Sequence, residues 1–143
     1  MEKLNNTLLY TIDKCFRSYH QFAQKNVKQA GYEITIDQWL ILKSIHENPD
    51  FSQNDIGKIL FKDNASITRI IQLLVKAGYL NRKEHPEDRR RVQLSLTPKG
   101  IKITEEVHLI ALENRANALK DVNPEHLQEL KQMLDQIIKN CTE

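Results

Sequence analysis

Hydrophobic positions along most of the chain recur every three or four residues, which is the spacing of one face of an α-helix. The first stripe predicts a long helix over about residues 4–30, which Gly31 ends. Its apolar positions are Leu4, Leu8, Ile12, Cys15, Phe16, Tyr19, Phe22, Ala23 and Val27. A second helix follows Thr35, because Thr35 and Gln38 have the spacing of a capping box. Its predicted buried stripe consists of Trp39, Leu40, Leu42 and Ile45.

Two further helices are predicted in the middle of the chain. Ser52 and Asp55 form another capping box, which opens a short helix with Ile56, Ile59 and Leu60 buried. After the turn at 61–64, the pattern predicts an amphipathic helix over about 65–77, and Gly78 is a plausible terminator. The inward positions of this helix are Ile67, Ile70, Ile71, Leu74 and Val75, which leave Ser66, Thr68, Arg69, Gln72 and Lys76 on the outer face.

Beyond Tyr79 the apolar period changes from helical spacing to two. Residues 80–85 are a poor helix candidate beside Pro86, and Val92, Leu94 and Leu96 alternate with polar residues. This pattern predicts a β-hairpin whose charged tip is residues 86–90. Thr97-Pro98 and Asn123-Pro124 then each read as a helix cap followed by the first helical residue. The two long helices that they open are expected to bury Ile101, Val107, Leu109, Ala111, Leu112 and Ala116 in the first, and Leu127, Leu130, Leu134, Ile137 and Ile138 in the second.

The composition fits one globular domain of 143 residues. The fold class predicted is mainly α with a small β-hairpin wing. Apolar stretches are far shorter than the ~20 residues of a membrane-spanning helix, and the first residues lack a signal-peptide pattern, so a cytoplasmic protein without a membrane partner is expected. Two cysteines are too few for a disulfide scaffold or a four-cysteine zinc site. Neither a phosphate-binding glycine loop, a nucleophile elbow nor an H-E-x-x-H motif is present, so we expect no enzyme and no cofactor.

Charge is distributed unevenly along the chain. Residues 58–91 hold nine Lys or Arg and four Asp or Glu, a balance of +5, so the rest of the chain carries −3 of the overall +2. A basic middle between acidic ends suggests a polyanionic partner. On its own this signal is weak, because a solvated surface can have the same composition.

The order of the predicted elements indicates where the basic residues lie in the fold. A short helix, a turn, an amphipathic helix and a two-stranded hairpin make a winged helix-turn-helix, and such a helix fits the ~12 Å wide major groove of DNA. The candidate base-reading residues are Ser66, Thr68, Arg69 and Gln72, with Lys62 and Asn64 as phosphate or cap residues at the helix entrance. The hairpin tip places Arg89, Arg90 and Arg91 together, where they can reach phosphates or the minor groove.

At this point the chain resembles the MarR family of bacterial transcriptional regulators. The resemblance covers nearly the whole chain, and the spacing between the D-x-R motif and L-x-L-T-x-x-G is its most specific part. The residues that carry it are Ser66-Ile67-Thr68-Arg69, Leu74…Gly78-Tyr79-Leu80…Arg82, Asp88-Arg89-Arg90 and Leu94-Ser95-Leu96-Thr97-Pro98-Lys99-Gly100.

The resemblance implies a homodimer on a palindromic operator in double-stranded DNA. Residues 34–97 would form the winged DNA-binding lobe, and residues 1–33 and 98–143 would interleave as the dimerisation lobe. The recognition helix would span about 64–76, Arg90 would enter the minor groove, and Asp88 would steady it by a salt bridge. A repressor is expected, and many members of the family bind small anionic or phenolic effectors between the two lobes. The effector-binding residues of this chain stay unknown.

Several other interpretations remain open from the sequence. A winged-helix module that docks on proteins without DNA is the rival from another class, although it would not need a basic middle. Cys15 could be the reactive thiol of an oxidant-sensing repressor, but its place on an apolar stripe is typical of a buried small hydrophobe. Trp39 could line a ligand cavity with Tyr19 and His20, or belong to the core. A metal site formed by His46, Glu105, Glu106 and His108 lacks compact ligand spacing, so none is expected.

Overall fold

The computed structural model describes residues 1–88 and 90–142. It contains a 3-10 turn η1 (Leu4–Asn6), six helices α1 (Leu8–Gln29), α2 (Ile36–Glu47), α3 (Gln53–Leu60), α4 (Asn64–Lys76), α5 (Pro98–Ala118) and α6 (Pro124–Thr142), and two strands β1 (Leu80–Glu84) and β2 (Val92–Leu96), within those residues. The chain is therefore mainly helical with a two-stranded antiparallel wing, and the predicted fold class is confirmed.

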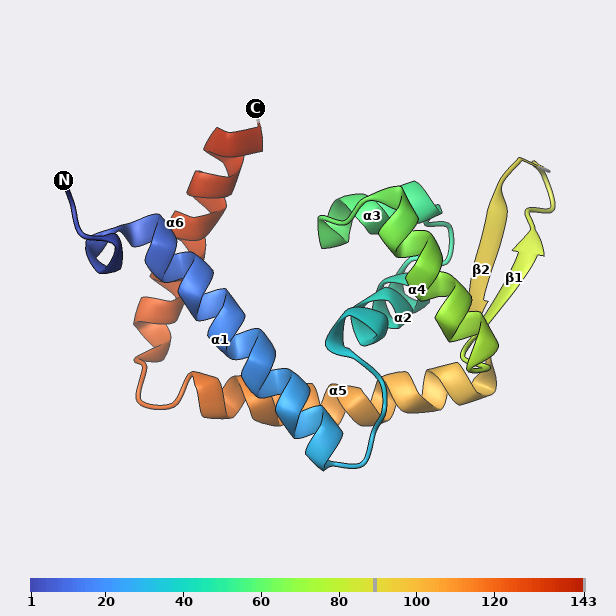
Figure 1. The fold of residues 1–143 in the computed structure, drawn as a ribbon, viewed down its shortest axis with the longest axis horizontal. Coiled ribbons are helices and arrows are strands. Elements are labelled where there is room, and N and C mark those ends of the chain that lie inside the picture. The colour runs from blue at the N-terminus through green and yellow to red at the C-terminus, as the bar shows by residue number, and fades with distance from the viewer. Residues whose placement is uncertain (89, 143) are drawn as a thin grey trace.

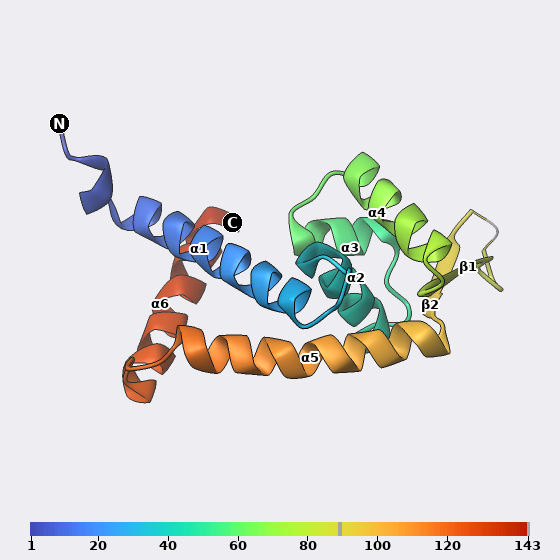
Figure 2. The same ribbon diagram turned by 60° about the horizontal axis from the view of Figure 1, so that its bottom comes forward.

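The elements form two parts that α5 connects. Figure 1 shows α2, α3, α4 and the hairpin grouped at one end of α5, while α1 crosses α5 and α6 turns back beside the other end. Figure 2 shows α5 running beneath both α1 and the winged lobe. One long helix thus fixes the winged lobe relative to the two terminal helices.

Side-chain caps set where the central helices begin. Thr35 and Gln38 exchange the two predicted capping-box hydrogen bonds at 3.0 Å each, and Ser52 and Asp55 do the same at 2.9 and 3.2 Å. At the end of α4, Gly78 takes φ +83°, a left-handed conformation that favours glycine. The predicted caps and this terminator are confirmed.

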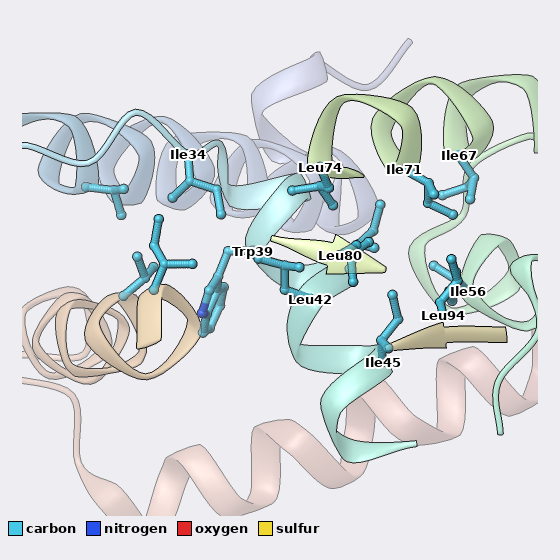
Figure 3. Packing of buried hydrophobic residues seen from close by; sticks show 14 of the residues in the cluster. Ile34, Trp39, Leu42, Ile45, Ile56, Ile67, Ile71, Leu74, Leu80 and Leu94 are labelled. Carbon is cyan, nitrogen blue, oxygen red and sulfur yellow. The ribbon is translucent and has the colours of Figure 1, made fainter. Parts of the chain in front are cut away.

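A single cluster of buried apolar side chains holds the winged lobe to α1 and α5. Figure 3 shows Ile67, Ile71 and Leu74 of α4 and Leu80 and Leu94 of the hairpin converging on α2. The indole N–H of Trp39 donates to the backbone oxygen of Thr104 at 3.1 Å, which adds a buried polar link between α2 and α5. Ile41 and Ile103 are also buried, although the pattern did not single them out.

The hairpin register follows from this packing. Leu80 of β1 lies opposite Leu96 of β2, and Arg82 lies opposite Leu94. Leu80 and Leu94 are buried, whereas Asn81, Arg82, Lys83 and Glu84 are exposed. The base of the wing is therefore anchored in the core, and its outer part projects into solvent.

Several apolar positions that we expected to be buried are exposed in the single chain. The first helix does not run unbroken from Leu4, because the 3-10 turn ends at Thr7 before α1 begins. The exposed positions among those predicted stripes are Leu4, Leu8, Cys15, Phe16, Phe22, Ile59, Leu109, Leu112, Ala116, Leu130 and Ile138. None of the described residues of α6 is buried. Within one chain these positions are therefore not buried: an apolar stripe marks a face that favours burial, but the fold of a single chain does not cover these faces.

No helix within the described residues is long and apolar enough to cross a membrane.

Candidate nucleic-acid interface

The first turn of α4 is capped by Asp63, one residue before Asn64, which was a predicted cap candidate. Asp63 is the N-cap: its carboxylate accepts from the Ser66 backbone N–H at 2.8 Å and from the Ser66 hydroxyl at 3.0 Å. The Ser66 N–H and hydroxyl bonds hold the pKa of Asp63 below its ordinary value. Asp63-x-x-Ser66 is a recognisable cap spacing, so this signal was present in the sequence.

Five recognition-helix residues were predicted, and in the structure some of them are exposed whereas others are hydrogen-bonded within the helix. Arg69 and Gln72 are exposed on the side of α4 opposite the buried Ile67, Ile71 and Leu74. Ser66 is committed to the cap, and the Thr68 hydroxyl donates to the backbone oxygen of Asn64 at 2.8 Å. Arg69 and Gln72 are therefore the long polar side chains available to reach base edges.

Gln53, the first residue of α3, belongs to this surface although it was not among the predicted residues. Its amide nitrogen donates to the Asn64 side-chain oxygen at 3.0 Å and to the Thr68 hydroxyl oxygen. No local pattern signals this pair, because it joins residues that are 11 and 15 positions apart. It links the two helices of the helix-turn-helix at the surface of α4.

The wing holds the predicted basic tip, with roles that differ between its residues. Arg90 is exposed, and its backbone N–H donates to the Asp88 carboxylate at 2.9 Å. Arg91 turns back toward the lobe and donates to the backbone oxygen of Asp50 at 3.4 Å. Arg89 lies outside the described residues. Asp88 thus shapes the turn through a backbone bond, whereas the resemblance implied a salt bridge to the arginine side chain.

Lys62, considered for phosphate or cap contact, pairs instead with Asp37 of α2 at 3.1 Å. His20 of α1 lies 3.6 Å from the other carboxylate oxygen of Asp37. These contacts bring α1, α2 and the turn before α4 together next to a cavity of about 510 Å³. The cavity lies between the winged lobe and helices α1 and α5, and its walls come from α1, α2, the end of α3 and α5.

The wall of this cavity is mainly apolar, and it includes one buried polar side chain, that of Asn114. Trp39, Tyr19 and His20 line it, so Trp39 belongs both to the core and to the cavity. Asn114 of α5 is 2% exposed, and its side-chain oxygen accepts from the Asn26 amide at 2.8 Å. Its own amide nitrogen has no hydrogen-bond partner among the described residues. Phe61, 92% exposed with φ +54°, stands at the rim.

The four residues considered for a metal line one groove between α2 and α5, namely His46, Glu105, Glu106 and His108. Among residues 1–88 and 90–142, however, no three His, Cys, Asp or Glu side chains gather closely enough to hold a metal ion. Glu106 accepts a hydrogen bond from the Tyr32 hydroxyl at 3.0 Å, and this bond raises the pKa of Tyr32. Glu106 therefore serves to tie the loop before α2 to α5.

The helix-turn-helix of α3 and α4 with a wing beside it defines a winged helix-turn-helix protein. Residues 34–92 match the model of the MarR family. The transcriptional regulator YhbI of Bacillus subtilis (strain 168), of the helix-turn-helix type and itself uncharacterised, is 27% identical over 115 residues, which are 78% of this chain and 75% of that protein.

Solved structures have the same fold. A cysteine-to-serine mutant of Escherichia coli MarR, in complex with operator DNA, superposes with a TM-score of 0.83 at 23% identity over 91% of this chain and 92% of that one. Bordetella bronchiseptica BpsR, whose DNA binding is regulated by 6-hydroxynicotinic acid, gives a TM-score of 0.86 at 20% identity over 96% of both chains. By its match over residues 34–92 and by its fold, the chain is similar to the MarR family of winged helix-turn-helix, DNA-binding transcriptional regulators.

Proposed function

We propose that this chain is a transcriptional repressor that binds a palindromic operator as a homodimer and releases it when an effector binds. The observation that carries the proposal is the common placement of α4 and the wing. The exposed face of α4 and the exposed tip of the wing flank the same lobe, which is the arrangement that lets one lobe contact a major groove and its adjacent backbone.

The DNA-contacting residues that we propose fall into two sets. On the recognition helix they are Asn64, Ser66, Thr68, Arg69 and Gln72; on the wing they are Asp88, Arg89, Arg90 and Arg91. Arg69 and Gln72 would read base edges, because they are long, polar and exposed. Arg90 would enter the minor groove, where negative potential attracts a guanidinium. Ser66 and Asp63 fix the start of the helix, so their part would be to position it.

The dimer follows from the uncovered apolar faces. Leu4, Leu8 and Leu9 at the start of the chain, Leu109 and Leu112 on α5, and Leu130, Met133 and Ile138 on α6 are all large and exposed. Exposed apolar residues in this number, concentrated on the helices outside the winged lobe, are typical of an obligate interface. Residues 1–33 and 98–143 would accordingly form the dimerisation lobe, and residues 34–97 the DNA-binding lobe. A second copy would place a second recognition helix one DNA turn away, about 34 Å.

The cavity between the lobes would be the effector site. Its apolar wall suits a small aromatic molecule, and the unpartnered Asn114 amide would donate to an acceptor oxygen such as a carboxylate or phenolate. The regulation of BpsR by 6-hydroxynicotinic acid, an aromatic acid of that description, supports this chemical class. Because α1 and α5 form one wall and α2 and α3 form another, a ligand there would change the spacing of the two DNA-binding lobes.

The alternative of a winged-helix module that binds only proteins is less well supported. Its surface would not require a net +5 over residues 58–91, nor exposed arginines on both α4 and the wing. A gel shift with the DNA upstream of its own gene, titrated with salt, separates the two. Steeply salt-dependent binding supports a DNA-binding regulator, and binding that is absent at low salt contradicts it.

The stoichiometry is tested by analytical ultracentrifugation of the free protein and of the complex. We expect a dimer of twice 16.7 kDa at micromolar concentration and one dimer per operator duplex. A monomer in both measurements would refute the dimer and leave the DNA-binding assignment standing.

A further inference from the structure

The side chain of Gln53 connects the first helix of the helix-turn-helix to the surface of the second. Its amide nitrogen, Nε2, lies 3.0 Å from Asn64 Oδ1 and within a short hydrogen bond of Thr68 Oγ1. The Thr68 hydroxyl also lies 2.8 Å from the backbone oxygen of Asn64, one helical turn earlier. Three polar side chains at the start of the recognition helix therefore form one network.

Counting protons fixes the direction of every bond in this network. A backbone carbonyl only accepts, so the single proton of the Thr68 hydroxyl is donated to Asn64. The hydroxyl oxygen must then accept from Gln53, whose amide has two protons, one for Thr68 and one for Asn64 Oδ1; the longer contact to the Asn64 backbone oxygen, at 3.5 Å, shares one of them. Both Gln53 protons and the only Thr68 proton are used inside the protein.

The network determines which groups in the first turn of α4 remain available to contact DNA. Thr68 has no free proton with which to contact the acceptors of guanine or the N7 of adenine, so what it can still present to DNA is its γ-methyl and the second lone pair of its hydroxyl oxygen. Asn64 has its oxygen bonded to Gln53, so its NH₂ group is the part available to a ligand. Without Gln53, both side chains could reorient and use either end.

We propose that Gln53 is a specificity-determining positioning residue: it directs Thr68 to recognise the C5-methyl group of thymine and Asn64 to act as a hydrogen-bond donor. This inference rests on the proposed function, because it takes α4 as the helix that enters the major groove. A thymine methyl is a known partner of apolar side-chain groups in that groove. Gln53 itself acts through the other two residues and needs no contact with DNA.

The test uses the full-length protein and a duplex that this protein selects from a random pool. Each thymine of that duplex is replaced in turn by deoxyuridine, which removes only the C5-methyl group. For the unmodified protein, one replacement in one half-site should weaken binding about fourfold, the effect of losing one buried methyl-sized contact, and the same replacement in both half-sites about 16-fold.

Two variants of Thr68 separate its methyl from its hydroxyl. Thr68→Val keeps a γ-methyl, and because the helix restricts a β-branched valine to one main χ1 rotamer without help from Gln53, it should retain the affinity and the deoxyuridine effect. Thr68→Ser keeps the hydroxyl but loses one methyl in each protomer, so it should bind about 16-fold more weakly and should no longer distinguish thymine from deoxyuridine at that position. Thr11 is the matched control, because its hydroxyl donates to the backbone oxygen of Thr7 at 3.1 Å on exposed α1. Because Thr11 lies in residues 1–33, sedimentation is used to verify that Thr11→Val and Thr11→Ser assemble like the unmodified protein, and both should then bind DNA like it.

Gln53→Met tests the positioning role, since methionine has a similar length and no amide protons. We expect the ratio of selected-duplex to random-duplex affinity to fall about tenfold, while random-duplex affinity and its salt dependence stay unchanged. Thermal unfolding is measured for each variant. If Gln53→Met is unfolded at the assay temperature, the Thr68 pair still decides the question.

The outcomes separate this inference from the proposed function. It is overturned if Thr68→Val loses affinity as much as Thr68→Ser, if no deoxyuridine replacement matters, or if folded Gln53→Met keeps full discrimination. Arg69→Ala serves as the reference arm. If Arg69→Ala loses discrimination in any of those cases, α4 still reads DNA and only this inference fails. If Arg69→Ala instead binds both duplexes like the unmodified protein, the recognition-helix assignment fails as well.

Discussion

Replacing Arg90 by alanine should reduce the salt dependence of DNA binding without disturbing the wing. Two backbone N–H donors hold the turn: the Arg90 N–H donates to the Asp88 carboxylate at 2.9 Å, and the Arg91 N–H donates to the Asp88 backbone oxygen at 3.1 Å. Alanine keeps both donors. The exposed guanidinium of Arg90 is the group that is lost.

The expected magnitude follows from counterion release. Each neutralised phosphate contributes about −0.9 to the slope of log K against log salt, and the proposed dimer loses two cations, so the slope should flatten by about 1.8. Over the fourfold rise from 50 to 200 mM salt, the unmodified protein should lose about 12-fold more affinity than the variant. Fluorescence anisotropy on a selected duplex and on a random duplex measures both slopes.

Matched variants show whether the effect belongs to the wing. Arg17→Ala removes an exposed arginine from α1, on the other side of the molecule from the hairpin (Figure 1), and should leave the slope unchanged. Asp88→Asn retains an acceptor for Arg90 N–H and should also keep the slope, because the carboxylate is bonded to the backbone. If Arg90→Ala matches the unmodified protein on both duplexes, the wing does not contact DNA. If Asp88→Asn behaves like Arg90→Ala, the salt bridge implied by the family resemblance is the better account.

Three other predictions test the fold and the alternatives. Gly100→Ala would drive a Cβ atom into the backbone oxygen of Tyr79, so we expect a loss of about 3 kcal/mol or more in denaturant unfolding, and an unchanged midpoint would contradict the packing. The pKa of Asp63 is lowered in the folded state, so the stabilisation that its carboxylate provides is present above the unfolded value of about 3.9 and is lost as pH falls through the lower folded value. Asp63→Asn should therefore reduce the acid-induced loss of thermal stability below about pH 4. An identical pH profile for the two proteins would refute the capping role. Cys15 is exposed on α1, and the nearby Arg17 is paired with Asp13 at 2.9 Å, so this cation is already engaged and does not activate the thiol. Low-micromolar organic peroxide should therefore leave DNA binding of both the unmodified protein and Cys15→Ser unchanged. A loss of binding in the unmodified protein alone would establish the oxidant-sensing alternative.

Local signals in the sequence were sufficient for most of the secondary structure, apart from the break at Thr7 and the Asp63 cap of α4. The capping boxes at Thr35 and Ser52, the terminator at Gly78 and the change of period after Tyr79 are each decided by residues within four positions of one another. The elements that they mark appear where they were predicted, and the wing follows the helix-turn-helix as the fold class required.

Contacts between distant segments could not be predicted in the same way. The apolar stripe of α6 indicated burial, yet no described residue of that helix is buried, because periodicity does not tell whether the cover comes from the same chain or another. The pairing of Gln53 with Thr68, of Lys62 with Asp37 and of Asn26 with Asn114 depends on how helices cross. Exposed polar residues carry no period that would reveal such partners.

Binding-site selection from random duplexes with the full-length protein tests the central claim most directly. We expect an inverted repeat whose half-sites are centred about one helical turn apart, ~10 base pairs, and we expect Arg69→Ala to lose the preference while it still binds DNA in low salt. Enrichment of no sequence, or of a single site without two-fold symmetry, would contradict a dimer that reads a palindrome through α4.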